Sequence, residues 1–219
     1  RPIEHDSVPS RYRASVRTVR NNFDMGEILE TVESPETYTF VCDATVCRTI
    51  PYDWRRLPPV VGVGIYDDDA NQWLPPDVAA RAYDRLGLPT VNAFERELPA
   101  RHFYPDRYDT PTSAWYDGPP AGILIRDKNG GRACRYSSGC EPDRSPETDN
   151  RDPEVLVDAY VTDDRLQQVL TAVGAPQDFD MIFERVIDRV FRETPAVVGD
   201  EDMRAFRSAT AKRIRHYLK

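Results

Sequence analysis

One stretch of the sequence, residues 115–136, constrains the fold more than any other. Ile123, Leu124 and Ile125 form a short apolar, partly β-branched run. Residues 127–131 (Asp-Lys-Asn-Gly-Gly) follow with Asn-Gly at their centre, and this pair favours the positive φ angles of tight turns. The chain then returns through residues 132–136. The pattern therefore predicts a β-hairpin of two antiparallel strands.

The predicted hairpin carries several charges close to its turn. Arg126, Asp127, Arg132 and Arg135 all lie within it. Such a surface faces either a bound anion or plain solvent along an exposed sheet edge. The pattern alone favours the solvated edge, because charged side chains are a common means of preventing edge strands from pairing with another chain.

The bulk properties of the chain set limits on its class. A length of 219 residues suits one domain with a small appendage. No apolar run approaches the roughly 18 residues that a membrane-spanning helix needs. Four cysteines do not make a disulfide scaffold in a chain this long, so we expect a reducing, cytoplasmic environment. The first residue is Arg1 rather than Met, which suggests a fragment of a longer protein.

The charge composition is unusual. The net charge is −8, yet only three of the 29 basic residues are lysines, and the other 26 are arginines. Acid-rich, lysine-poor chains resemble proteins adapted to strong salt. The net acidity argues against nonspecific nucleic-acid binding at low salt, but it leaves a local basic groove open.

Periodicity divides the chain into a mixed region, a linker and a helical region. We expect a domain over 1–138 and a polar, proline-bearing linker over 139–151. Beyond the linker, apolar residues recur at helical spacing, which predicts a small helical module over 152–219. The mixed region is expected to contain helices at 9–22, 25–32 and 78–86 and strands at 37–45, 60–66 and 90–95; the module is expected to contain helices at 154–160, 163–173, 180–192 and 202–218.

Several short motifs, taken in order, resemble those of a known family. Residues 121–126 (Ala-Gly-Ile-Leu-Ile-Arg) are similar to a strand that reads Glu-Gly, three apolar residues and Lys or Arg, and residues 132–134 (Arg-Ala-Cys) are similar to Arg-Ala-Lys. Upstream, residues 40–45 and 58–67 look like two further strands of the same family. Over residues 8–136 the chain therefore resembles the ATP-dependent RNA ligases, which are covalent nucleotidyltransferases.

This resemblance implies a fold and an activity. The implied fold class is α+β, a mostly antiparallel nucleotidyltransferase domain that is incomplete at its N-terminus and precedes the helical module. In the family, the lysine of a Lys-x-Asp-Gly motif attacks the α-phosphate of ATP, and AMP then passes to an RNA 5′-phosphate that a 3′-hydroxyl joins. The implied cofactors are ATP and Mg²⁺, and the implied partner is RNA.

The chain departs from the family at the positions that carry this chemistry. It contains no Lys-x-Asp-Gly, and its one Asp-Gly pair, Asp117-Gly118, has no lysine before it. Val63, Ala121 and Cys134 stand where the resemblance implies an aromatic residue, a glutamate and a lysine. Asp43 takes the place of the strand glutamate and is the one catalytic candidate. We therefore expect an impaired ligase, unless an upstream segment or a second chain supplies the lysine.

The remaining candidate residues are mostly cationic. Two functions compete: a ligase-like protein that contacts nucleotide and RNA, and a noncatalytic module that binds RNA or a partner through the basic face of the last helix. In both cases the alternative for each residue is an ordinary surface salt bridge. The nucleotide-binding candidates are Tyr66, Arg126, Lys128, Arg132 and Arg135, and the RNA-binding candidates are Arg48, Arg213 and Arg215.

The cysteines raise one further hypothesis. If the strands that carry them faced one pocket, four thiols would be available to bind Zn²⁺. Their spacing is wider than that of common zinc knuckles, which favours isolated thiols and no metal site. The four are Cys42, Cys47, Cys134 and Cys140.

Overall fold

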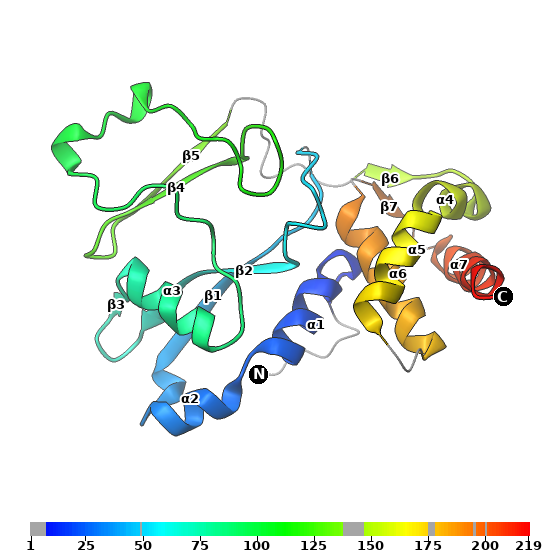
Figure 1. The fold of residues 1–219 in the computed structure, drawn as a ribbon, viewed down its shortest axis with the longest axis horizontal. Coiled ribbons are helices and arrows are strands. Elements are labelled where there is room, and N and C mark those ends of the chain that lie inside the picture. The colour runs from blue at the N-terminus through cyan, green and yellow to red at the C-terminus, as the bar shows by residue number, and fades with distance from the viewer. Residues whose placement is uncertain (1–7, 49, 138–146, 175–177, 195, 200) are drawn as a thin grey trace. The chain divides into compact units, whose positions relative to one another are not determined.

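The chain separates into two compact units (Figure 1). The computed structural model describes residues 8–48, 50–137, 147–174, 178–194, 196–199 and 201–219. The sheet unit consists of Ser15–Thr45 and Thr49–Glu141. The helical unit consists of Arg1–Ala14, Val46–Arg48 and Pro142–Lys219, so it takes in two short N-terminal segments besides the module expected at 152–219.

The sheet unit is built from antiparallel strands and short helices. Strands β1, β2 and β3 form one sheet in that order, and β4 and β5 form the predicted hairpin. Together with the helical unit they make a mixed, α+β arrangement of helices and antiparallel strands. The bounds are α1 Arg13–Asn22, α2 Met25–Thr31, β1 Tyr38–Ala44, β2 Val60–Asp67, β3 Gln72–Trp73, α3 Pro76–Arg85, β4 Gly122–Arg126 and β5 Arg132–Tyr136.

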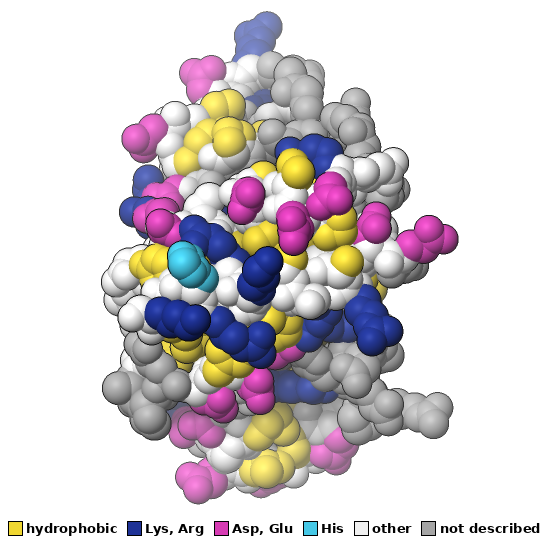
Figure 2. Space-filling model, turned by 90° about the vertical axis from the view of Figure 1, so that its right-hand side faces the viewer, with side chains coloured by type: hydrophobic (Ala, Val, Ile, Leu, Met, Phe, Trp, Pro, Cys, Tyr) yellow, Lys and Arg dark blue, Asp and Glu magenta, His cyan; other side chains and the backbone are white. Residues whose placement is uncertain are grey.

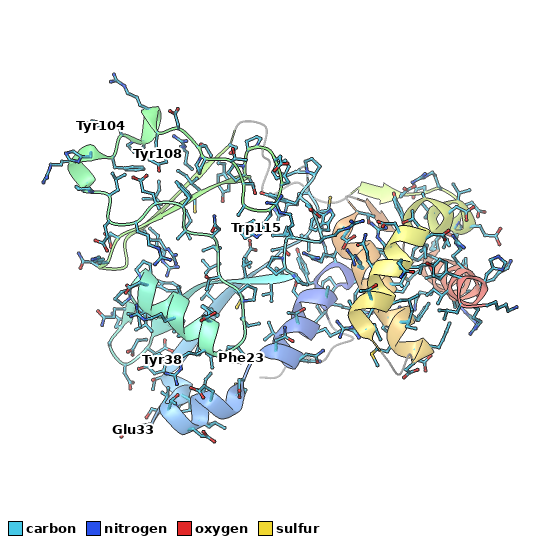
Figure 3. The ribbon with its side chains drawn as sticks, viewed as in Figure 1. Phe23, Glu33, Tyr38, Tyr104, Tyr108 and Trp115 are labelled. Atoms are coloured by element: carbon cyan, nitrogen blue, oxygen red, sulfur yellow. The ribbon has the colours of Figure 1, made fainter. Side chains whose placement is uncertain are left out.

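The core of the sheet unit lies between β2 and α3. Val60, Ile65 and Tyr83 are buried there, and Phe23 and Tyr38 pack against them (Figure 3). Helix α3 begins with prolines at its first turn, where a missing N–H costs nothing, and Gly87 follows its end with a φ of 76°. The sequence thus places a well-bounded helix over the central strand.

Tyr83 fits into an irregularity of the sheet. The register of β1 against β2 shifts between Val41 and Cys42, which marks a β-bulge. The Tyr83 hydroxyl lies 2.9 Å from the Val41 carbonyl oxygen and 3.1 Å from that of Gly64, so it provides a donor where the strand ladder is disturbed. A Cβ at Gly62 would lie 2.6 Å from the Tyr83 ring, and only glycine allows this approach.

The helical unit packs four helices around one apolar core. Leu156, Leu166, Val186, Phe206 and Ile214 are among its buried side chains. A side chain caps each of the first three helices: Asp152, Thr162 and Asp178 accept from backbone N–H groups of the first turn. The bounds are α4 Pro153–Tyr160, α5 Asp163–Val173, α6 Phe179–Glu193 and α7 Met203–Tyr217, with a parallel strand pair β6 Glu147–Asp149 and β7 Ala196–Val198.

A buried ionic network joins α5 to α6. The Glu193 carboxylate accepts from Arg189 Nε at 2.5 Å and lies 3.2 Å from Arg165 Nη2. Arg192 Nη1 lies 3.9 Å from the same carboxylate, and burial lowers the pKa of Arg192 to about 10. Because several guanidiniums share one buried carboxylate, removing Glu193 would take away the counter-charge that Arg165 and Arg189 share.

Two local predictions were wrong. The strand expected at 90–95 does not form: Thr90 makes a single parallel bridge to Gly62, and Phe94 and Glu95 are exposed with no strand beside them. Within the linker expected at 139–151, residues 139–146 lie outside the described residues. Residues 147–149 form β6, because their backbone pairs with β7 although their polar side chains give no strand pattern.

Candidate functional site

Two arginines of the hairpin are paired across its strands. Arg126 ends β4 and Arg132 begins β5, and the two residues are partners in the antiparallel register. Directly opposite residues of an antiparallel pair project from the same face. The turn between them holds them in place, since Asp127 Oδ1 accepts from the backbone N–H groups of Asn129 and Gly131, both at 2.8 Å.

Each of these arginines also contacts the three-stranded sheet. Arg126 Nη1 donates to the Val63 carbonyl oxygen at 2.6 Å. The Arg132 guanidinium lies over the Trp73 indole, 3.2 Å from the ring centroid. A Cβ at Gly64 would lie 2.6 Å from Arg132 Nη2, so glycine at this position leaves room for the Arg132 guanidinium where it lies. The hairpin is thereby fixed against β2 and β3.

Aromatic rings form the other side of this cluster. The Trp73 and Tyr66 rings meet edge to face with their centroids 5.2 Å apart. Tyr66 donates its hydroxyl to Asn71 Oδ1 at 2.7 Å, which fixes its ring at the β2–β3 turn. We call the set Tyr66, Trp73, Arg126 and Arg132, together with Arg96, the arginine cluster.

Burial first, and like charges second, set the electrostatics of the arginine cluster. Burial lowers the pKa of Arg126, and the nearby guanidiniums of Arg132 and Arg96 lower it further. Burial also lowers the pKa of Arg132. Over the described ranges of the chain, no carboxylate lies within ion-pair distance of Arg96, Arg126 or Arg132. An anion placed among them would relieve this repulsion.

Two other candidates on the hairpin are engaged elsewhere. Lys128 pairs with Glu97 at 2.9 Å, and both side chains are largely exposed. Arg135 donates to the Tyr108 carbonyl oxygen at 2.7 Å and also bonds Pro105 and Thr110. It therefore ties the loop that carries Tyr104 and Tyr108 to the hairpin (Figure 3). These contacts give Arg135 a structural role in the loop.

The remaining candidates are spread over both units. Asp43 is exposed on β1 opposite Val61, and Arg48 is exposed in the segment Val46–Arg48 of the helical unit. Arg213 forms an ion pair with Asp163, and the Arg215 guanidinium lies 4.7 Å from the centroid of the Phe179 ring. The structure thus brings Tyr66, Arg126 and Arg132 together. Sequence reasoning missed Trp73 and Arg96, although a tryptophan beside an acidic turn was an available signal.

The three cysteines that the structure describes carry free thiols. Burial raises the pKa of Cys42, whose thiol donates to the Tyr83 hydroxyl, and burial likewise raises the pKa of Cys47. Cys134 is exposed on β5, and Cys140 lies outside the described residues. Within the part of the chain that the structure describes, no three His, Cys, Asp or Glu side chains gather as metal ligands.

Comparisons with family models, with curated proteins and with solved structures found no match. Helices that combine the length and the apolar character needed to cross a membrane do not occur in the described residues. A function for this chain therefore has to be inferred from its own side chains, and the arginine cluster offers the most specific chemistry among them.

Proposed function

We propose that this is a cytoplasmic RNA ligase-like protein whose arginine cluster binds the phosphate groups of a nucleotide or of an RNA 5′ end. The observation that carries the proposal is the Arg126–Arg132 pair, which projects from one face of the hairpin beside Trp73 and has no described carboxylate within ion-pair distance. The antiparallel sheet and the hairpin would then correspond to the nucleotidyltransferase domain that the sequence motifs imply.

The chemistry of guanidinium groups suits this role. Each guanidinium has five N–H donors, and Arg126 uses one of them on the Val63 carbonyl oxygen, which leaves donors for a ligand. Planar guanidiniums match phosphate oxygens in pairs, and Arg132 is held in one orientation by the indole beneath it. Binding would therefore require little further ordering of either side chain.

The proposed function is binding of phosphate groups, without adenylyl transfer. The chain contains no Lys-x-Asp-Gly, and Ala121 and Cys134 lack the groups that the family uses on the metal and the phosphates. ATP fits the cations and rings of the cluster. Magnesium does not fit, because the described residues offer no group of carboxylates near it, so no step through a metal is assigned.

Calorimetric titration with ATP, with inorganic triphosphate and with adenosine tests this function. ATP and triphosphate should bind, whereas adenosine should not. Each charged hydrogen bond contributes about 1.5–3 kcal/mol, so the double variant Arg126→Gln/Arg132→Gln should weaken ATP binding by at least about tenfold. The matched control is Arg81→Gln/Arg85→Gln, which removes two exposed arginines of the same unit.

Two results would contradict the proposal. Equal ATP affinity in the double variant and in the control would show that the arginine cluster is not the phosphate site. A mass increase of one AMP on the intact protein after incubation with ATP and Mg²⁺ would show that the chain adenylylates itself, against the expectation from its missing lysine motif.

A further inference from the structure

Helix α7 carries a row of exposed cations on one side. Arg204, Lys212 and Arg215 are exposed in the helix, and Lys219 is exposed just beyond it. At about 100° per residue, these four positions fall within an arc of roughly 80°. We call them the α7 row. Figure 2 shows Lys and Arg side chains gathered in a band across this face of the helical unit.

The opposite side of α7 is buried in the helical unit. Phe206, Thr210 and Ile214 are at most 1% exposed and belong to the buried interior of the helical unit. They lie roughly 120–160° around the helix from the centre of the row, to one side or the other. The packing of this face therefore fixes the row toward solvent, and α7 has no free apolar face to insert into a lipid surface.

The row differs from its neighbouring arginines in its charge balance. Arg207 pairs with Glu184 at 2.5 Å, and Arg213 pairs with Asp163. By contrast, no carboxylate in the described ranges pairs with Arg204, Lys212, Arg215 or Lys219, and α7 itself contains no acidic residue. An unneutralised cationic row is thus maintained on a chain whose net charge is −8.

We propose that the α7 row binds the phosphate backbone of a nucleic-acid strand without reading its sequence. From Arg204 to Lys219 the row extends about 22 Å at a rise of about 1.5 Å per residue, enough to meet several phosphates. A protein partner would need buried aromatic or apolar anchors, and the row offers none. This surface belongs to the other unit from the arginine cluster, so it stands independently of the function proposed there.

The expected signature is a salt dependence. Each phosphate that a cation neutralises on a single strand contributes about −0.7 to the slope of log affinity against log salt. Four cations therefore predict a slope of about −3 for the α7 row. Replacing three of them should reduce the steepness of the slope by about 2 and weaken binding by about tenfold or more at low salt.

Fluorescence anisotropy of a labelled single-stranded RNA of about 20 nucleotides, titrated with the full chain at several KCl concentrations, measures both quantities. The test variant is Arg204→Gln/Lys212→Gln/Lys219→Gln. The matched control is Arg81→Gln/Arg85→Gln/Arg101→Gln, which changes the net charge equally at exposed positions of the sheet unit. The control should bind within about twofold of the unchanged protein with the same slope.

Several outcomes would overturn the proposal. It fails if the unchanged chain does not bind RNA at low salt, or if both triple variants lose affinity equally. It also fails if phosphatidylserine vesicles compete with RNA for the row, or if sedimentation shows that the row instead joins two copies of the chain. Far-ultraviolet circular dichroism checks that the helices are intact. RNA binding that survives in Arg126→Gln/Arg132→Gln would separate this surface from the arginine cluster.

Discussion

The Tyr83 hydroxyl offers a sharp test of how the sheet unit is held together. Tyr83→Phe removes a single oxygen from a side chain that is 0% exposed, while the ring stays against Gly62. The hydroxyl is within hydrogen-bond distance of the Val41 and Gly64 carbonyl oxygens at the β-bulge. The substitution therefore probes this polar contact without creating a large cavity.

The size of the effect follows from the burial of these groups. A net hydrogen bond contributes about 1 kcal/mol, and a buried carbonyl left without a donor costs about 1–3 kcal/mol. We expect Tyr83→Phe to lower the free energy of unfolding of the sheet unit by about 2 kcal/mol. With a urea m-value of about 2 kcal/mol/M, the unfolding midpoint should fall by about 1 M.

Tryptophan fluorescence in a urea titration provides the assay. Trp54, Trp73 and Trp115, the three tryptophans of the chain, all lie in the sheet unit, so the signal reports on that unit. Tyr66→Phe is the matched control, because its hydroxyl bonds Asn71 at an exposed turn and should contribute less than about 0.5 kcal/mol. Equal midpoints for the two variants would refute the role assigned to the Tyr83 hydroxyl.

Two further predictions concern the two units separately. Gly62→Ala should destabilise the sheet unit by about 1–3 kcal/mol in the same fluorescence titration, because its Cβ would lie 2.6 Å from the Tyr83 ring; an unchanged midpoint would contradict this. In the helical unit, hydrogen bonds from Arg151 and then Tyr160 hold the pKa of Asp149 well below its usual range. The stabilisation that the ionised Asp149 carboxylate gives the fold is therefore present above the unfolded pKa of about 4. It is lost as the pH falls through the lower pKa of the folded state. Asp149→Asn should be less stable than the unchanged protein at neutral pH, with the difference shrinking in acid, as followed by circular dichroism.

Local chemistry made parts of this fold predictable. The hairpin at 122–136 was predictable because the hydrogen bonds that define its turn are local. Asp127 accepts from backbone N–H groups of the same turn, and Gly130 has a φ of 93°. The helix at 163–173 was similarly indicated by Thr162, which caps it. The strands expected at 37–45 and 60–66 also form, as β1 and β2, because their own apolar, β-branched pattern marks them. Sequence reasoning failed where the local pattern and the available partner disagree. β6 pairs through its backbone alone, and residues 90–95 alternate like a strand but lack a neighbour beyond Thr90.

In the candidate site, too, the local features could be predicted and the contacts between distant residues could not. Arg126 and Arg132 were predicted from the sequence, and their pairing follows from the hairpin. Trp73 could not be assigned, because its contact with Arg132 depends on how the hairpin lies against β3. On the last helix, Arg213 stood out as a contact for RNA, yet Asp163 neutralises it from α5. Such partners lie far along the chain, and no local pattern reveals them.

The discontinuous make-up of the helical unit has a consequence for biosynthesis. All of the sheet unit has been translated once residue 141 is made, so it can fold while the rest of the chain is still being synthesised. The segments 8–14 and 46–48 are translated early, but they pack in the unit whose helices are translated last. The Cys47 N–H, for example, can donate to the Arg192 carbonyl oxygen only after residue 192 has been made. On the ribosome, the segments 8–14 and 46–48 would thus reach their native contacts only after residues far downstream have been made.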